Sequence, residues 1–157
     1  MSHMLVDLKN IDAAYNGKIV LKDVSLEIHA EDFIGVIGPN GGGKTTLLNI
    51  ILGLLKPDKG SIVRNIEKSD IGFLPQVNQF DNQFPITVSD VVLSGMTTGF
   101  NLRKRKNAFT DQKVKSTLEA VGISELKNRP IGELSGGELQ RTMLARAIIS
   151  SPKILVL

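Results

Sequence analysis

Apolar and polar positions alternate with a period of two near the N-terminus. Residues 5–11 alternate loosely, and residues 24–28 alternate strictly between apolar and polar side chains. This period predicts two strands, the second of them half exposed. Residues 33–37 form a continuous apolar run, which predicts a strand buried on both faces, as in a parallel sheet.

Helical spacing follows a glycine-rich turn and dominates the second half of the chain. Residues 45–55 and 111–121 place their aliphatic side chains on one side, as amphipathic helices do. The short apolar runs 71–74 and 154–157 predict further strands, the last of them buried. Capping boxes mark the start of two more helices: Thr87 with Asp90, and Ser135 with Glu138.

Composition narrows the class of protein without naming a function. The chain has 157 residues, of which 41% are hydrophobic and 22% charged, so we expect a folded domain with a core. The net charge of +3 is too small to argue for nucleic acid. Because cysteine is absent, neither a disulfide framework nor a thiolate metal site is expected. We find no signal peptide and no apolar stretch of about 18 residues, so any membrane role must come through a partner.

The glycine-rich turn carries the strongest chemical signal. Residues 38–45 read Gly-Pro-Asn-Gly-Gly-Gly-Lys-Thr and fit the pattern G-x-x-x-x-G-K-[ST] between a strand and a helix. Glycines let backbone N–H groups point at a triphosphate, and the helix dipole adds positive potential. Lys44 would reach the β- and γ-phosphates, and the Thr45 hydroxyl would bind Mg²⁺. The predicted nucleotide-binding residues are Gly38, Asn40, Gly41, Gly42, Gly43, Lys44, Thr45 and Thr46.

A second anion site is predicted at residues 134–138, Leu-Ser-Gly-Gly-Glu. A serine cap and exposed amides at a helix N-terminus suit a phosphate, and one domain has little use for two such sites unless one serves a partner. With the phosphate loop, this string resembles the ATP-binding subunits of ABC transporters, whose signature is LSGGQ. The resemblance covers nearly the whole chain, with Glu138 in place of the glutamine. It implies a head-to-tail dimer, in which Ser135, Gly136, Gly137 and Glu138 of one copy close over the ATP of the other.

Two further positions match the family in order. Tyr15 stands where the family has an aromatic residue that stacks on adenine, although an ordinary exposed strand aromatic would look the same. Gln76 matches the Q-loop glutamine, which implies contact with Mg²⁺ or the attacking water and coupling to transmembrane permease subunits. The alternative for Gln76 is a polar residue at a strand end. The resemblance thus implies ATP and Mg as cofactors, with Thr45 and Gln76 as the Mg²⁺ contacts.

The order of elements predicts an α/β fold. We expect a P-loop NTPase core with N-terminal antiparallel β strands and an inserted α-helical subdomain, incomplete at the C-terminus. Residues 1–3 are interpreted as a remnant of expression cloning. The expected parts are a β subdomain with the P-loop core (4–76), a mainly helical subdomain (77–150) and the start of the Walker B strand (151–157).

After such a strand the family continues with an aspartate for Mg²⁺ and a glutamate that polarises the attacking water. Both carboxylates are absent from the chain, which leaves Gln76 as its catalytic candidate. Phosphoryl transfer depends on positioning and electrostatics. We therefore expect the parent protein to be an ATPase, and this chain to hydrolyse ATP poorly or not at all.

Residues 81–95 and 129–134 resemble the ATPases of zinc and manganese transporters. This likeness implies the energising subunit of a metal importer, cytoplasmic and peripheral on the inner face of the membrane, with no nucleic-acid partner. An iron-chelate importer is the nearest alternative. A soluble ABC ATPase that acts on nucleic acid or ribosomes, and a nucleotide-binding module without catalysis, are the others. The basic run 103–106 is interpreted as a solvated loop.

Overall fold

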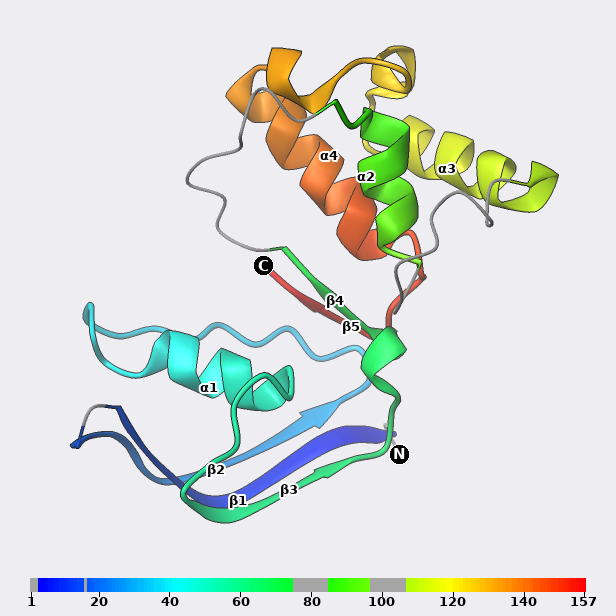
Figure 1. Cartoon of the computed structure of the whole chain (residues 1–157). Coiled ribbons are helices and arrows are strands. Elements are labelled where there is room, and N and C mark those ends of the chain that lie inside the picture. The colour runs from blue at the N-terminus through cyan, green and yellow to red at the C-terminus, as the bar shows by residue number, and fades with distance from the viewer. Residues whose placement is uncertain (1–2, 16, 75–84, 97–106) are drawn as a thin grey trace. The chain divides into compact units, whose positions relative to one another are not determined.

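The computed structural model describes residues 3–15, 17–74, 85–96 and 107–157. The chain divides into two compact units, Met1–Lys68 and Ser69–Leu157. Figure 1 labels the elements of each unit. Each unit is described by itself below.

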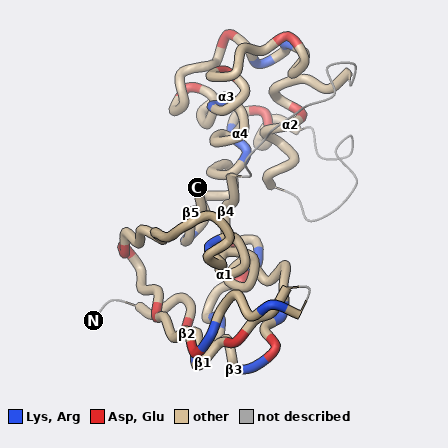
Figure 2. Tube along the Cα trace, turned by 90° about the vertical axis from the view of Figure 1, so that its left-hand side faces the viewer, with Lys and Arg blue, Asp and Glu red and all other residues tan. Residues whose placement is uncertain are grey.

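The first unit is a three-stranded antiparallel sheet with one helix on one face (Figure 1). β1 (Met4–Tyr15) lies in the middle, between β2 (Lys18–His29) and β3 (Lys59–Arg64). The predicted N-terminal antiparallel strands are therefore confirmed, whereas β3 was not predicted. The strands of this unit carry both basic and acidic residues (Figure 2).

The core of this unit is formed by β1 and by the inner side of α1 (Lys44–Ile51). β1 buries every residue from Leu5 to Leu8, Asp7 included, so burial along this strand departs from the period of two that the sequence indicates. The helix ends at Ile51 and not at residue 55 as predicted, because Gly53 adopts a left-handed φ of 70°. The buried apolar residues are Leu5, Val6, Leu8, Ile11, Ala13, Leu21, Leu47, Ile50 and Ile51.

The prediction of a buried strand at residues 33–37 is wrong. These residues belong to no strand, and Phe33 and Ile37 are almost fully exposed, Ile37 at 95%. A strand needs a hydrogen-bonding neighbour, and none of the described strands pairs with this run. Apolar composition alone therefore did not place the segment in a sheet.

In its described residues, the second unit contains three helices and a pair of parallel strands. The helices are α2 (Val88–Ser94), α3 (Ala108–Ala120) and α4 (Gly136–Ile148), with short 3-10 turns at Ser124–Leu126 (η3) and Ile131–Glu133 (η4). β4 (Ile71–Phe73) follows the 3-10 turn η1 (Lys68–Asp70) and pairs in parallel with β5 (Ile154–Val156). The strand predicted at 154–157 is present, but of its residues only Val156 is buried.

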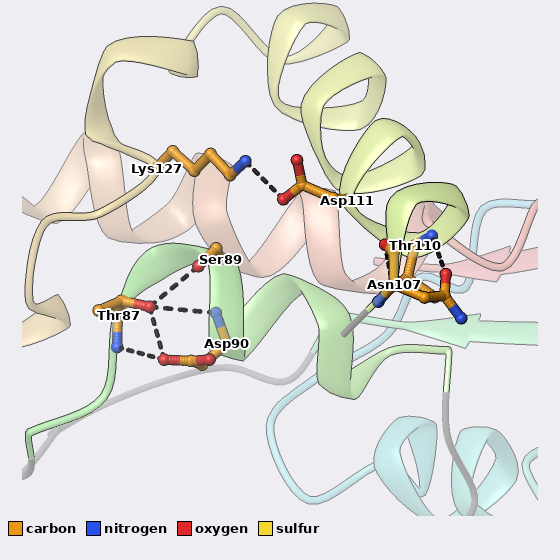
Figure 3. A network of polar contacts seen from close by, with 7 residues as sticks. All are labelled: Thr87, Ser89, Asp90, Asn107, Thr110, Asp111 and Lys127. Atoms are coloured by element: carbon orange, nitrogen blue, oxygen red, sulfur yellow. Dashed lines mark hydrogen bonds and ion pairs between the residues drawn. The ribbon is translucent and has the colours of Figure 1, made fainter. Parts of the chain in front are cut away.

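The helix starts of this unit show why the sequence folds locally as it does. Thr87 and Ser135 cap α2 and α4 in reciprocal capping boxes, as predicted. α3 begins earlier than the predicted residue 111, because Asn107 and Thr110 form a third capping box. Figure 3 shows the first and third boxes, beside an ion pair of 2.6 Å between Lys127 Nζ and Asp111 Oδ1.

The helices of the second unit pack around a common apolar core. α2, α3 and α4 each contribute buried side chains, and the segment after α3 adds two more. Gly95 follows α2 at a close approach, since a Cβ there would collide with the Arg146 carbonyl of α4. The members of the core are Val88, Val92, Leu93, Val114, Leu118, Ile123, Leu126, Ala145 and Ile149.

The fold is mixed α/β, with an antiparallel sheet at the N-terminal end and a helical region after β4, as the order of elements predicted. Among the described residues, no helix has the length and apolar character needed to cross a membrane.

Candidate functional site

The phosphate loop is a short turn that ends directly in α1. Asn40 and Gly41 form the turn, and the Gly42 amide donates to the Pro39 carbonyl at 3.1 Å. Gly41 and Gly43 adopt left-handed φ angles of 79° and 83°. These conformations favour glycine, which is the physical reason for glycine at both positions.

The N-terminus of α1 has the features of an anion site. Gly43 is its N-cap, and neither a side-chain cap nor an acidic residue is found in its first turn. In the described part of the chain, the first amide of the helix bonded to a protein acceptor is that of Leu47, at 2.9 Å from the Gly43 carbonyl. The amides of the first turn are therefore free to donate to a phosphate.

Lys44 lies across the same loop. Its Nζ donates to the carbonyls of Gly38 and Pro39, at 2.7 and 2.8 Å. The Lys44 ammonium thus binds both residues at the start of the loop. Thr45 and Thr46 follow it in the helix, where Thr45 is exposed and Thr46 is half-buried. The predicted phosphate-loop residues from Gly38 to Thr46 are therefore gathered in one place. This donor set fits a nucleotide phosphate and its Mg²⁺, with the Thr45 hydroxyl as the available protein oxygen.

Of the two other residues predicted to contact nucleotide or metal, Tyr15 and Gln76, the structure describes only Tyr15. Tyr15 ends β1 and its side chain is 69% exposed, so its ring is accessible, and adenine stacking stays a prediction. Gln76 lies outside the described residues, as do residue 81 and the basic run 103–106. Within the described ranges, no group of three or more His, Asp or Glu side chains could hold a metal ion.

The signature residues form the N-terminus of α4. The Ser135 Oγ accepts from the Glu138 amide at 3.4 Å, and the Ser135 amide donates to the Glu138 carboxylate at 2.7 Å. Gly136 and Gly137 are exposed, and a Cβ at either would meet nothing within 4 Å. The phosphate loop of the first unit and the N-terminus of α4 thus each present a group of amides. The second group has an acidic residue, Glu138, beside it.

Hydrogen bonding and charge both favour the ionised form of that acid. The hydrogen bonds to Ser135 hold the pKa of the Glu138 carboxyl below its usual value, and the nearby Arg129 and Arg141 charges add to this effect. Arg129 lies 3.8 Å from the Glu138 carboxylate and 3.5 Å from that of Glu133. Nothing in the spacing of residues 129 and 138 along the sequence indicates this contact.

Comparison with known proteins places these motifs in a family. Residues 21–157 match the family described as ABC transporter. The chain is 44% identical to a metal transport system ATP-binding protein of Thermotoga maritima, covering 98% of this chain and 60% of that protein. It is 37% identical to the zinc import ATP-binding protein ZnuC of Hydrogenovibrio crunogenus, covering 98% of this chain and 59% of that protein.

Solved structures agree with this assignment. A metal-chelate type ABC transporter in an inward-facing conformation superposes with a TM-score of 0.80 at 30% identity, over 95% of this chain and 57% of that one. An ATP-binding cassette of another ABC transporter gives 0.80 at 27% identity, over 99% of this chain and 68% of that one. The chain thus spans about three fifths of the length of the curated relatives named above. Its phosphate loop, its signature sequence and its fold all agree with the family match, and the chain belongs to the ABC transporter ATP-binding family.

Proposed function

We propose that residues 38–46 bind the phosphates of Mg-ATP and that Tyr15 stacks on the adenine. The observation that carries the proposal is the phosphate loop itself. The amides of the first turn of α1 have no hydrogen-bond acceptor in the described part of the chain, and the Lys44 ammonium lies 2.7 and 2.8 Å from the carbonyls of Gly38 and Pro39 in the same loop. A bound triphosphate would offer this ammonium stronger, anionic acceptors than the carbonyls. Mg²⁺ would neutralise phosphate charge, with the Thr45 hydroxyl and Gln76 as its protein contacts.

A calorimetric titration of Mg-ATP into the chain tests this proposal. We expect saturable binding that is lost in Lys44→Ala, because the variant keeps the loop backbone but removes the cation that faces the phosphates. A Thr45→Ala variant should weaken binding of Mg-ATP more than binding of ATP with EDTA, since its hydroxyl serves the metal. Equal titration curves for the chain and Lys44→Ala would reject the proposal.

The N-terminus of α4 would serve a second copy of the chain. Its exposed Gly136 and Gly137 amides suit a phosphate, and a two-fold, head-to-tail dimer would bring them over the nucleotide held by the partner copy. Ser135 and Glu138 would complete the contact in trans. In this arrangement each nucleotide is bound by the loop of one copy and the helix end of the other.

The whole protein would couple nucleotide binding to ATP hydrolysis, which the match to the ABC transporter family supports. Phosphate release by the whole protein should exceed that of its Lys44→Ala variant in a steady-state assay. Equal release by the two proteins would contradict this part of the proposal.

The transport substrate of the whole protein would be zinc or manganese. The named relatives support this choice, since one is called a zinc import protein and another a metal transport protein. The ATPase would lie on the cytoplasmic side of the membrane, bound to permease subunits and without a nucleic-acid partner. A structural relative of metal-chelate type keeps an iron-chelate importer as the second candidate. Uptake of radioactive zinc, manganese and chelated iron by vesicles that contain the full transporter would separate these substrates.

A further inference from the structure

An acid at the N-terminus of α4 creates an electrostatic problem for the second phosphate site. The Glu138 side chain turns back to accept from the Ser135 amide at 2.7 Å, so its charge is held at the helix end where Gly136 and Gly137 are exposed. A carboxylate stabilises a helix N-terminus, but it also repels any phosphate that approaches the same amides. A site of this kind needs a nearby cation to offset the acid.

Arg129 supplies that cation from a different part of the second unit. Its guanidinium Nη1 lies 3.8 Å from Glu138 Oε1, and its Nε lies 3.5 Å from Glu133 Oε2. The side chains of Arg129 and Glu138 are 43% and 24% exposed, so the pair is partly shielded from solvent. Arg141 contributes a second, weaker positive influence on Glu138.

The backbone around Arg129 is held by hydrogen bonds to the first residue of α2 and to the segment before that helix. The Arg129 carbonyl accepts from the Val88 amide at 3.0 Å, and the Ile131 amide donates to the Ile86 carbonyl at 3.0 Å. Thr87 and Pro130 form an antiparallel bridge between these bonds. The guanidinium is therefore presented from an ordered segment, which lowers the entropy lost when it pairs with Glu138.

We propose that Arg129 is a positioning and charge-compensating residue of the signature helix. It offsets the Glu138 carboxylate, so that this acid can cap α4 without repelling the nucleotide phosphate that a second copy of the chain brings to the Gly136 and Gly137 amides. The inference rests on the proposed function, because the repelled ligand is the nucleotide of the composite site. It adds a residue to that site which the signature string does not contain.

A double-mutant cycle tests the proposal by nucleotide-dependent self-association. Sedimentation velocity with Mg-ATPγS would compare the unmodified chain with Arg129→Gln, Glu138→Gln and the double variant. Arg129→Gln should weaken association by about fivefold or more, since the acid is left uncompensated. Glu138→Gln should not weaken it, because the Gln amide oxygen can still accept from Ser135. The double variant should return to within about twofold of Glu138→Gln.

This rescue separates compensation from a merely structural role for Arg129. If Arg129 only held the fold, its loss would persist in the double variant, and that result would overturn the proposal. Arg129→Lys keeps the charge and should retain most of the association. Glu133→Gln is the matched control, because it removes the other ion pair of Arg129 and leaves Glu138 in place, and it should associate like the unmodified chain.

A second readout does not depend on nucleotide. Titration of the Glu138 side-chain carboxyl carbon by NMR should show its pKa rising toward the usual value in Arg129→Gln and not in Glu133→Gln. If the pKa of Glu138 did not change in Arg129→Gln, the proposed interaction of Arg129 with Glu138 would be rejected, irrespective of the results with nucleotide. If the unmodified chain bound Mg-ATP no better than Lys44→Ala does, that result would instead count against the proposed function. Nucleotide binding by the unmodified chain without self-association would overturn the role in trans.

Discussion

Gly41 and Gly43 share a left-handed backbone but have different surroundings. At Gly41, with φ of 79°, an added Cβ would meet nothing within 4 Å. At Gly43, with φ of 83°, it would lie 2.5 Å from the Val20 carbonyl and 2.8 Å from Leu21 Cδ2 of β2. We expect Gly41→Ala to destabilise the first unit by about 1–2 kcal/mol, from the backbone conformation alone. Gly43→Ala should cost roughly 1–3 kcal/mol more, because β2 must also move.

Urea unfolding followed by circular dichroism would measure both glycine variants. Gly41→Ala acts as the control, since it carries the same backbone strain without the contact to β2. Equal free energies of unfolding for the two variants would show that β2 does not constrain the loop. In Mg-ATP titrations, Gly43→Ala should also bind more weakly than Gly41→Ala, because a displaced β2 moves the start of α1.

Glu138 should make the stability of α4 depend on pH. Its hydrogen bonds to Ser135 lower its pKa from the usual 4.5 in the folded state, so the unfolded state binds its proton first as pH falls. The stabilisation is therefore complete above pH 4.5 and is lost as pH decreases through the lowered folded pKa. We expect the difference in melting temperature between the unmodified chain and Glu138→Gln to be constant above pH 4.5 and to shrink as the pH falls below that value. Glu133→Gln keeps the Glu138 cap, so the pH dependence that this cap confers should persist in that variant.

At the scale of elements, Arg64 ties α1 to the sheet of the first unit. It lies at the end of β3, and its Nε donates to the Ile51 carbonyl at 3.1 Å, while its Nη2 donates to the Ile50 carbonyl. A cation at the helix C-terminus satisfies carbonyls that have no partner within the helix. Because hydrogen bonds from charged donors contribute more than neutral ones, Arg64→Met should destabilise the first unit by about 1.5–3 kcal/mol.

Thermal unfolding of Arg64→Met beside Lys59→Met tests that tie. Lys59 lies on the same strand, and its ammonium forms an exposed ion pair with Asp12 at 3.7 Å. Such a pair contributes at most about 1 kcal/mol, so Lys59→Met should melt close to the unmodified chain. If both variants lost the same stability, the effect would be one of surface charge and not of the α1 contact.

Helix starts were the most predictable feature of the fold, because a cap is encoded within four residues. Thr87 with Asp90 and Ser135 with Glu138 both form capping boxes as predicted. Asn107 with Thr110 forms a capping box of the same kind, but this less usual pair of residues is not evident from the sequence. The ends of helices were harder to predict. α1 ends before Gly53, which adopts a left-handed conformation, although the apolar spacing of the sequence continues past this glycine.

Long-range pairing was the feature that local patterns could not supply. β3 was missed and the run 33–37 was wrongly assigned to a buried strand, since a strand exists only with a neighbour and the sequence does not name one. The same limit applies to the candidate site. The phosphate loop is contiguous and was found from its spacing, whereas the contact of Arg129 with Glu138 joins separate segments and needed the structure.

At the scale of the whole molecule, each compact unit has its own core and one of the two groups of amides that we propose to bind phosphate. The loop around Lys44 belongs to the first unit, and the helix end at Ser135 belongs to the second. A ligand that binds only a folded site stabilises the unit that forms it, by about 2.7 kcal/mol when its concentration is 100 times Kd. Nucleotide should therefore protect the two units under different conditions.

Hydrogen exchange with mass spectrometry can detect that difference. At low protein concentration, Mg-ATPγS should slow exchange in the loop and α1 and leave the amides of residues 136–138 unchanged. At higher concentration, a head-to-tail dimer should add protection at residues 136–138, because a partner's nucleotide then covers them. Protection of the second site that does not vary with protein concentration would argue against binding in trans. Lys44→Ala should abolish both effects, since the second requires nucleotide held by the first.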